Sequence, residues 1–139
     1  MTVIDSSAAV DLLLGAGVAA DVEVLIESQD ELAAPDLLVL EVLAVIRRQV
    51  LRGQLADARA TGAVQDLGDL AVELFPSLPL RGRAWELRSN LTAADALFVA
   101  LAEQLGEPLA TKDSGLAKAA AKHTAVEVVR LPREGETRR

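Results

Sequence analysis

Four acidic residues are candidates for one shared site: Asp5, Glu41, Asp95 and Asp113. Asp5 ends a short apolar run at Val3–Ile4, and Asp113 follows another at residues 108–111. In open α/β sheets, sites form at the carboxyl ends of the strands, so these two acids are expected near each other. Carboxylate oxygens suit Mg²⁺ or Mn²⁺, which activate water and hold phosphoryl oxygens. The set therefore predicts a hard-cation site acting on a phosphoryl group.

The three aspartates also have a structural alternative, the capping of a helix. Asp5 and Asp113 each stand between an expected strand and an expected helix, where Asp is a favoured N-cap. Thr92 and Asp95 match a capping box, in which the third residue after the cap reaches back to it. Considered one at a time, each aspartate fits capping as well as metal binding, so both interpretations remain open.

Glu41 is unusual because it lies within the apolar segment LLVLEVLAVI. On a helix, positions 38, 41, 45 and 48 share one face, and Leu38 and Val45 flank Glu41 there. We therefore expect its carboxylate to point inward or into a cleft, where it needs a partner. A shared metal ion would be such a partner, and a position at the rim of the buried face is the alternative.

Composition disfavours several other chemistries. The 139 residues include no cysteine, which excludes thiolate sites and fits a cytoplasmic protein. The one histidine, His123, lies in a Lys/Ala-rich stretch and is expected at the surface, which disfavours a serine triad or a two-histidine ribonuclease. The net charge of −7 and the 2% aromatic content argue against non-specific nucleic-acid binding and base stacking.

The elements that must position these acids alternate between strand and helix. We expect strands at 3–4, 31–34, 71–75, 108–111 and 125–131, and helices at 6–14, 19–28, 36–52, 55–70, 79–89, 92–105 and 113–122. This pattern predicts a doubly wound α/β fold with a mainly parallel sheet and helices on both faces. One domain is expected over residues 1–131, with a frayed tail at 132–139. No apolar run is long enough to predict a membrane span.

The sequence resembles the PIN-domain family, and within it the VapC-type toxins of bacterial toxin–antitoxin pairs. The resemblance rests on IDSSAAVDLLL, PDLLVLEVLAVIRR and LTAADALFVALAEQLGEPLATKDSGLAKAA. It implies a PIN-like fold in which Asp5, Glu41, Asp95 and Asp113 surround Mg²⁺, or Mn²⁺, and hydrolyse RNA. Ser6 and Thr111 match small hydroxyl residues that support such a site. A cognate antitoxin and a homodimer are also implied. Ala94 departs from a tyrosine of many relatives, and Gly115 and Leu116 stand where some carry a further acid.

Unevenly placed basic residues are candidates for RNA phosphate contacts, namely Arg47, Arg48, Arg88 and Lys112. Ordinary solvated helix ends are the alternative for each.

Two further functions compete with the nuclease. A receiver-like phosphoacceptor domain would need an aspartate at the end of a central strand, and the strand expected to be central, VELFP, ends without one. A catalytically degenerate PIN-fold binding module would not need all four acids.

Overall fold

In the computed structural model, which describes residues 1–28 and 31–132, strands and helices alternate along the chain. The strands are β1 (Thr2–Ile4), β2 (Leu32–Pro35), β3 (Val72–Phe75), β4 (Leu109–Thr111) and β5 (Val128–Arg130). The helices are α1 (Ser6–Leu14), α2 (Ala19–Glu27), α3 (Leu38–Leu51), α4 (Asp57–Leu67), the 3₁₀ turn η1 (Leu78–Leu80), α5 (Arg81–Glu86), α6 (Ala93–Leu105) and α7 (Ser114–His123). The predicted tail lies, from residue 133 onward, outside the described residues.

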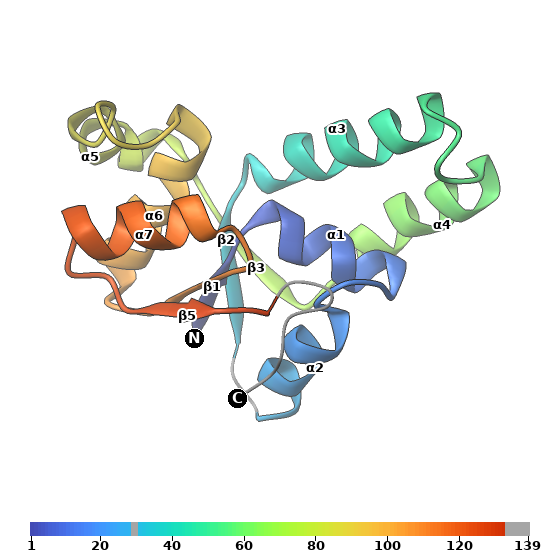
Figure 1. The fold of residues 1–139 in the computed structure, drawn as a ribbon, viewed down its shortest axis with the longest axis horizontal. Coiled ribbons are helices and arrows are strands. Elements are labelled where there is room, and N and C mark those ends of the chain that lie inside the picture. The colour runs from blue at the N-terminus through green and yellow to red at the C-terminus, as the bar shows by residue number, and fades with distance from the viewer. Residues whose placement is uncertain (29–30, 133–139) are drawn as a thin grey trace.

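The five strands form one sheet in the order β3-β2-β1-β4-β5, and every neighbouring pair is parallel. Figure 1 shows α5, α6 and α7 on one side of this sheet and α1, α3 and α4 on the other. This arrangement follows from right-handed crossovers, because the chain moves in one direction from β1 to β3 and in the opposite direction from β3 to β5. The predicted doubly wound α/β fold is confirmed.

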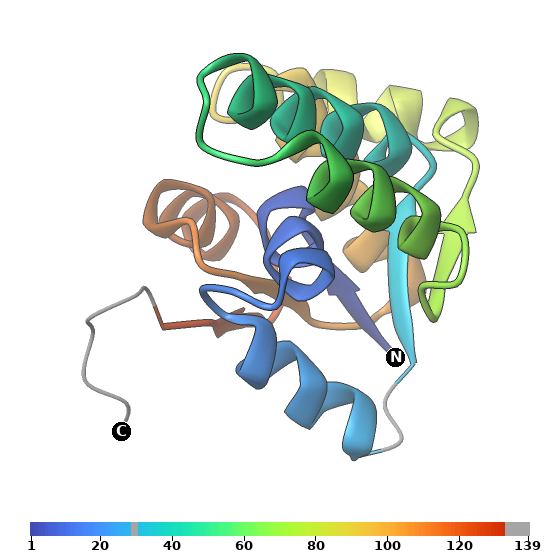
Figure 2. The same ribbon diagram turned by 90° about the vertical axis from the view of Figure 1, so that its right-hand side faces the viewer.

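The centre of the sheet is almost wholly apolar. β1 and β4 are buried along their lengths, and α6 covers them with side chains that include Phe98 and Leu101, both at most 1% exposed. On the opposite side, α3 and α4 pack together as a helical pair beside α1 (Figure 2). Within the described part of the chain, no helix has the length and apolarity needed to cross a membrane.

The pairing of β1 with β4 places the segments that carry Asp5 and Asp113 side by side. Ile4 is opposite Ala110, so the next residues, Asp5 and Thr111, lie together at the carboxyl ends of these strands. The direction of strand order reverses between β1 and β4, and ligand sites of open α/β sheets form at this switch point. The sheet thus places Asp5 and Asp113 where the sequence predicted them.

The strand VELFP was predicted to be central, and this prediction is wrong. Its residues 72–75 form β3 at the edge of the sheet, whereas the central strand is β1, which is followed by Asp5. The chain therefore does have an aspartate after its central strand. The strand order nevertheless differs from the 2-1-3-4-5 order of receiver-type flavodoxin-like folds.

Several boundaries also differ from those predicted. The helix predicted from residue 36 begins at Leu38, with Leu37 as its cap, while the Asp36 carboxylate accepts a hydrogen bond from Ser77 Oγ at 2.5 Å and the Asp36 N–H donates to the carbonyl of Phe75. Among the other differences, α4 and β5 are shorter than the predicted 55–70 and 125–131, and η1 with α5 occupies residues 78–86 in place of the predicted 79–89.

Candidate active site

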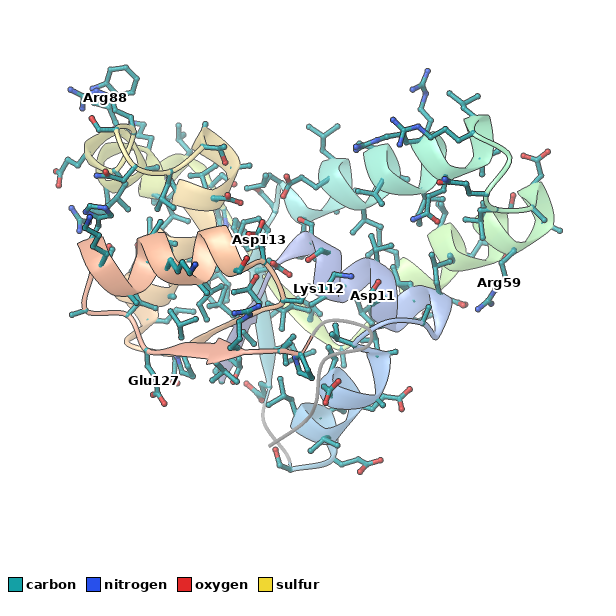
Figure 3. The ribbon with its side chains drawn as sticks, viewed as in Figure 1. Asp11, Arg59, Arg88, Lys112, Asp113 and Glu127 are labelled. Atoms are coloured by element: carbon teal, nitrogen blue, oxygen red, sulfur yellow. The ribbon has the colours of Figure 1, made fainter. Side chains whose placement is uncertain are left out.

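All four predicted acids line a single pocket of about 570 Å³ at the carboxyl ends of β1 and β4. Its walls come from α1, α3, the start of α6 and the segment that leads into α7 (Figure 3). The lining residues are Asp5, Ser6, Ser7, Val10, Asp11, Leu40, Glu41, Ala44, Val45, Arg48, Gln49, Asp95, Phe98, Lys112 and Asp113. Residues more than 100 positions apart in sequence therefore meet at one place.

Asp5 is both a helix cap and a pocket residue. Its Oδ1 accepts hydrogen bonds from the Ala8 N–H and from Ser7 Oγ, each at 3.0 Å, and its Oδ2 accepts one from Thr111 Oγ1. The residue is only 6% exposed. Burial raises the pKa of this carboxyl above 3.8, an effect that the three hydrogen bonds oppose and the negative charge of Asp113 reinforces. Capping and membership of the acidic site are thus compatible.

Thr111 connects Asp5 to Asp113. Its hydroxyl donates to Asp5 and accepts the backbone N–H of Asp113 at 3.0 Å, and its side chain is fully buried. Asp113 caps α7, since its Oδ1 accepts the Leu116 N–H at 3.1 Å, and its side chain is exposed. Thr111 therefore links two of the four acids through its hydroxyl group.

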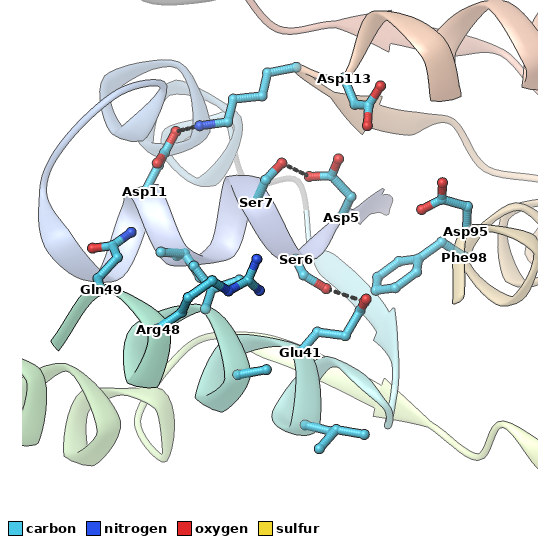
Figure 4. A pocket seen from close by; sticks show the side chains of 15 residues that line it. Asp5, Ser6, Ser7, Asp11, Glu41, Arg48, Gln49, Asp95, Phe98 and Asp113 are labelled. Carbon is cyan, nitrogen blue, oxygen red and sulfur yellow. Dashed lines mark hydrogen bonds and ion pairs between the residues drawn. The ribbon is translucent and has the colours of Figure 1, made fainter. Parts of the chain in front are cut away.

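Glu41 is held against α1 by the other predicted supporting residue. Ser6 Oγ donates to Glu41 Oε1 at 2.5 Å, and Figure 4 shows the glutamate reaching from α3 toward the pocket. Along the predicted face, Leu38 is buried, Glu41 and Val45 are half-buried and Arg48 is exposed. Since Glu41, Val45 and Arg48 all line the pocket, Glu41 lies on a cleft wall rather than in the core.

Asp95 faces the other three acids. Its backbone N–H donates to Thr92 Oγ1 at 3.2 Å, as the capping box predicts, while its carboxylate points into the pocket (Figure 4). Burial raises the pKa of Asp95 above 3.8, a hydrogen bond with Thr92 lowers it, and the charges of Asp113, Glu41 and Asp5 raise it further. Repulsion from the other three carboxylates therefore adds to the effect of burial on the pKa of Asp95.

The donor set fits a hard divalent cation. Four carboxylates with two adjacent hydroxyls offer oxygen ligands only, and their uncompensated negative charge would be offset by a bound cation. Among residues 1–28 and 31–132, however, no three carboxylate or imidazole side chains are close enough together to form a ready-made metal site. The acids would therefore have to come closer together to hold a cation.

Two of the four predicted RNA-binding residues lie at this pocket. Arg48 and Lys112 are lining residues, Arg48 from α3 and Lys112 from the turn before α7. Arg47 instead lines a separate hollow between α3 and α4. The guanidinium of Arg88 lies 4.6 Å from the centre of the Trp85 ring, beyond α5 (Figure 3). The structure thus separates the candidates into a pair at the acids and two residues elsewhere.

Three polar pocket residues, Ser7, Asp11 and Gln49, were not predicted from the sequence. Asp11 accepts hydrogen bonds at its Oδ2 from Lys112 Nζ, at 2.5 Å, and from the Val18 N–H, at 3.1 Å. A signal for it existed in the sequence, because Asp11, like Glu41, interrupts an apolar helical stretch, AAVDLLL. Ser7 and Gln49 carry no comparable signal, since either residue type is ordinary at a helix surface.

Comparison with known proteins places these features in a family. The PIN-domain family matches residues 2–122 of the chain. Ribonuclease VapC12 of Mycobacterium tuberculosis is 37% identical over 129 residues, which cover 93% of this chain and 99% of the relative. Ribonuclease VapC1 of the same organism is 39% identical over 129 residues, covering 92% of this chain and 97% of the relative.

Solved structures show the same fold at lower sequence identity. PAE2754 from Pyrobaculum aerophilum superimposes with a TM-score of 0.69 at 22% identity, covering 94% of this chain and 88% of that one. FitAcB from Neisseria gonorrhoeae superimposes with a TM-score of 0.65 at 20% identity, covering 94% of this chain and 97% of that one. With a family match over most of its length and acids from four segments at the expected edge of the sheet, the chain belongs to the PIN-domain family and, within it, to the VapC ribonucleases.

Proposed function

We propose that this protein is a Mg²⁺- or Mn²⁺-dependent endoribonuclease that acts as the toxin of a toxin–antitoxin pair. The observation that carries the proposal is the convergence of Asp5, Glu41, Asp95 and Asp113 on one pocket at the switch point of the sheet. The relatives named as VapC ribonucleases support RNA as the substrate. The presence of all four acids argues against a degenerate binding module.

Asp5 differs from the other three acids in how firmly it is held. Asp5 is the buried member, fixed by Thr111, Ser7 and the first turn of α1, so it provides a rigid anchor. Glu41, Asp95 and Asp113 come from α3, α6 and the start of α7 and would complete the ligand set around it. When bound there, a divalent cation supplies Lewis acidity, which activates water and offsets charge on a phosphodiester.

The remaining pocket residues suit an anionic strand. Arg48 and Lys112 provide positive charge in the same pocket as the acids, so a polyanion can approach a site that is otherwise strongly negative. This arrangement supports phosphate contacts by these two residues in particular. It also accounts for how a protein with a net charge of −7 could act on RNA, because only the local charge at the cleft has to favour the substrate.

The proposed partners are a separately encoded antitoxin and a second copy of the chain, in a cytoplasmic setting. Pairing with an antitoxin is the expectation for a VapC-type protein, and it would keep the nuclease inactive until the antitoxin is removed. Light scattering on the purified protein would measure the mass in solution, and a monomer at micromolar concentration would contradict the homodimer.

The decisive experiment is an RNA cleavage assay on the purified chain with Mg²⁺. We expect cleavage by the wild type and by Asp66→Asn, which changes an exposed acid on α4 that does not line the pocket. Asp95→Asn should lose cleavage while keeping the circular dichroism spectrum of the wild type. Wild-type cleavage by a folded Asp95→Asn variant would overturn the proposed function.

A further inference from the structure

Lys112 lies next to Asp113 in sequence and shares a pocket with all four acids of the candidate metal site. An ammonium group in the same pocket as four carboxylates is a potential competitor for a metal cation. Since the four carboxylates are negatively charged, they would attract a cation of any kind. The position of the Lys112 side chain therefore matters for metal binding.

The Lys112 ammonium is bound by Asp11 on the second turn of α1. The distance from Nζ to Asp11 Oδ2 is 2.5 Å, and the two side chains are 31% and 14% exposed. Figure 3 shows this pair beside α1, and in Figure 4 Asp11 and Gln49 lie at one end of the pocket while Asp95 and Asp113 lie at the other. The pair spans 101 residues of sequence, so it is a tertiary contact rather than a local one.

The turn after α1 fits closely around the Asp11 carboxylate. The Val18 N–H donates to the same Oδ2 at 3.1 Å. Gly17 has a φ of +54°, and a Cβ at this position would lie only 2.7 Å from Asp11 Cγ, so a side chain there would displace the carboxylate. Asp11 is thus fixed independently of Lys112, as expected for a group whose role is to hold the lysine.

We propose that Asp11 is a positioning residue that holds the Lys112 ammonium at the end of the pocket away from Asp95, so that the lysine does not occupy the place of the metal cation. The inference rests on the proposed metal-dependent function. Without Asp11, the Lys112 side chain is drawn to the four carboxylates, and their cation must then displace it or bind beside it. The loss of Asp11 therefore weakens metal binding through Lys112, although Asp11 is not itself a ligand.

Binding of Mn²⁺ alone, measured by titration calorimetry on the full chain, tests this. Asp11→Asn keeps an oxygen for the Val18 N–H but loses the charge that holds Lys112, so its Mn²⁺ affinity should fall roughly tenfold, as a nearby unit charge implies. Lys112→Gln should bind Mn²⁺ at least as well as the wild type. The double variant should match Lys112→Gln, which a purely structural role for Asp11 would not produce. Asp66→Asn is the matched control for loss of one acidic charge.

Gly17→Ala provides a second route, because its methyl group displaces the Asp11 carboxylate while leaving both charges in the chain. Its Mn²⁺ affinity should also fall, and Lys112→Gln should restore it. Wild-type affinity in Asp11→Asn, or a double variant as weak as Asp11→Asn, would overturn the positioning role alone. A wild-type protein that binds no Mn²⁺ would overturn the proposed function and, with it, this inference.

Discussion

Replacing Asp5 separates its structural role from its chemical one. The residue is 6% exposed, and it accepts hydrogen bonds from the Ala8 N–H, Ser7 Oγ and Thr111 Oγ1. Asn is as good an N-cap as Asp and removes the buried charge, but it has one acceptor oxygen where Asp5 uses two, so it can keep the bond from the Ala8 N–H and not the one from Thr111. Because relief of the buried charge offsets part of this lost bond, we expect the unfolding free energy of metal-free Asp5→Asn at pH 7 to lie within about 2 kcal/mol of the wild type.

Asp5→Ala should be much less stable. It removes a cap worth about 1 kcal/mol and leaves the buried Thr111 hydroxyl without its acceptor, at a cost of about 1–3 kcal/mol. The sum of about 2–4 kcal/mol corresponds to a Tm lower by roughly 7–14 °C for a chain of this length. Both variants should lose RNA cleavage, because each removes the buried charge that anchors the cation.

Thermal melts followed by circular dichroism in chelator, beside a cleavage assay in Mg²⁺, measure both effects. If Asp5→Asn melts as low as Asp5→Ala, an amide at this position does not cap α1 and our account of the buried cap is wrong. If Asp5→Asn is folded and cleaves RNA at the wild-type rate, Asp5 is not part of the metal site.

Three further outcomes are expected. Chelation should abolish RNA cleavage and either Mg²⁺ or Mn²⁺ should restore it, since all proposed ligands are oxygens; undiminished cleavage in chelator would rule out this mechanism. Glu41→Gln keeps an acceptor for the Ser6 hydroxyl but removes a charge that repels the other three acids. Thermal melts should therefore show a higher Tm without metal and a smaller rise in Tm on adding Mn²⁺ than in the wild type. A wild-type response in both measurements would place Glu41 outside the site. The pKa values of Asp5 and Asp95 are raised in the folded state, so the folded state binds protons at these groups more tightly than the unfolded state does. The stability that this proton binding contributes is complete below about pH 3.8 and is lost as the pH rises through the two folded pKa values. The metal-free Tm, measured from pH 7 down to pH 4, should therefore rise more on acidification in the wild type than in the Asp5→Asn/Asp95→Asn double variant, and equal changes in Tm would contradict the raised pKa values.

Local sequence signals predicted most elements of the fold and some roles of the site residues. Gly15 and Gly106 end α1 and α6 in the left-handed conformation, which glycine adopts without strain. Thr92 caps α6 through the N–H of Asp95, as its spacing indicates. The start of α3 is an exception, because the helix begins two residues after the predicted position 36, and the Asp36 carboxylate instead binds Ser77 from a distant segment.

The sequence by itself determined the alternation of strands and helices, the capping positions of Asp5 and Asp113, and the unusual placement of Glu41 in an apolar helix. These features depend on neighbours within one or two turns, so periodicity and residue type reveal them. The edge position of β3, the bond from Thr111 to Asp5 and the pairing of Lys112 with Asp11 were decided only by the tertiary structure. Strand order and contacts across 100 residues depend on the packing of the whole chain, so the sequence of a single segment does not indicate which distant segment it will contact.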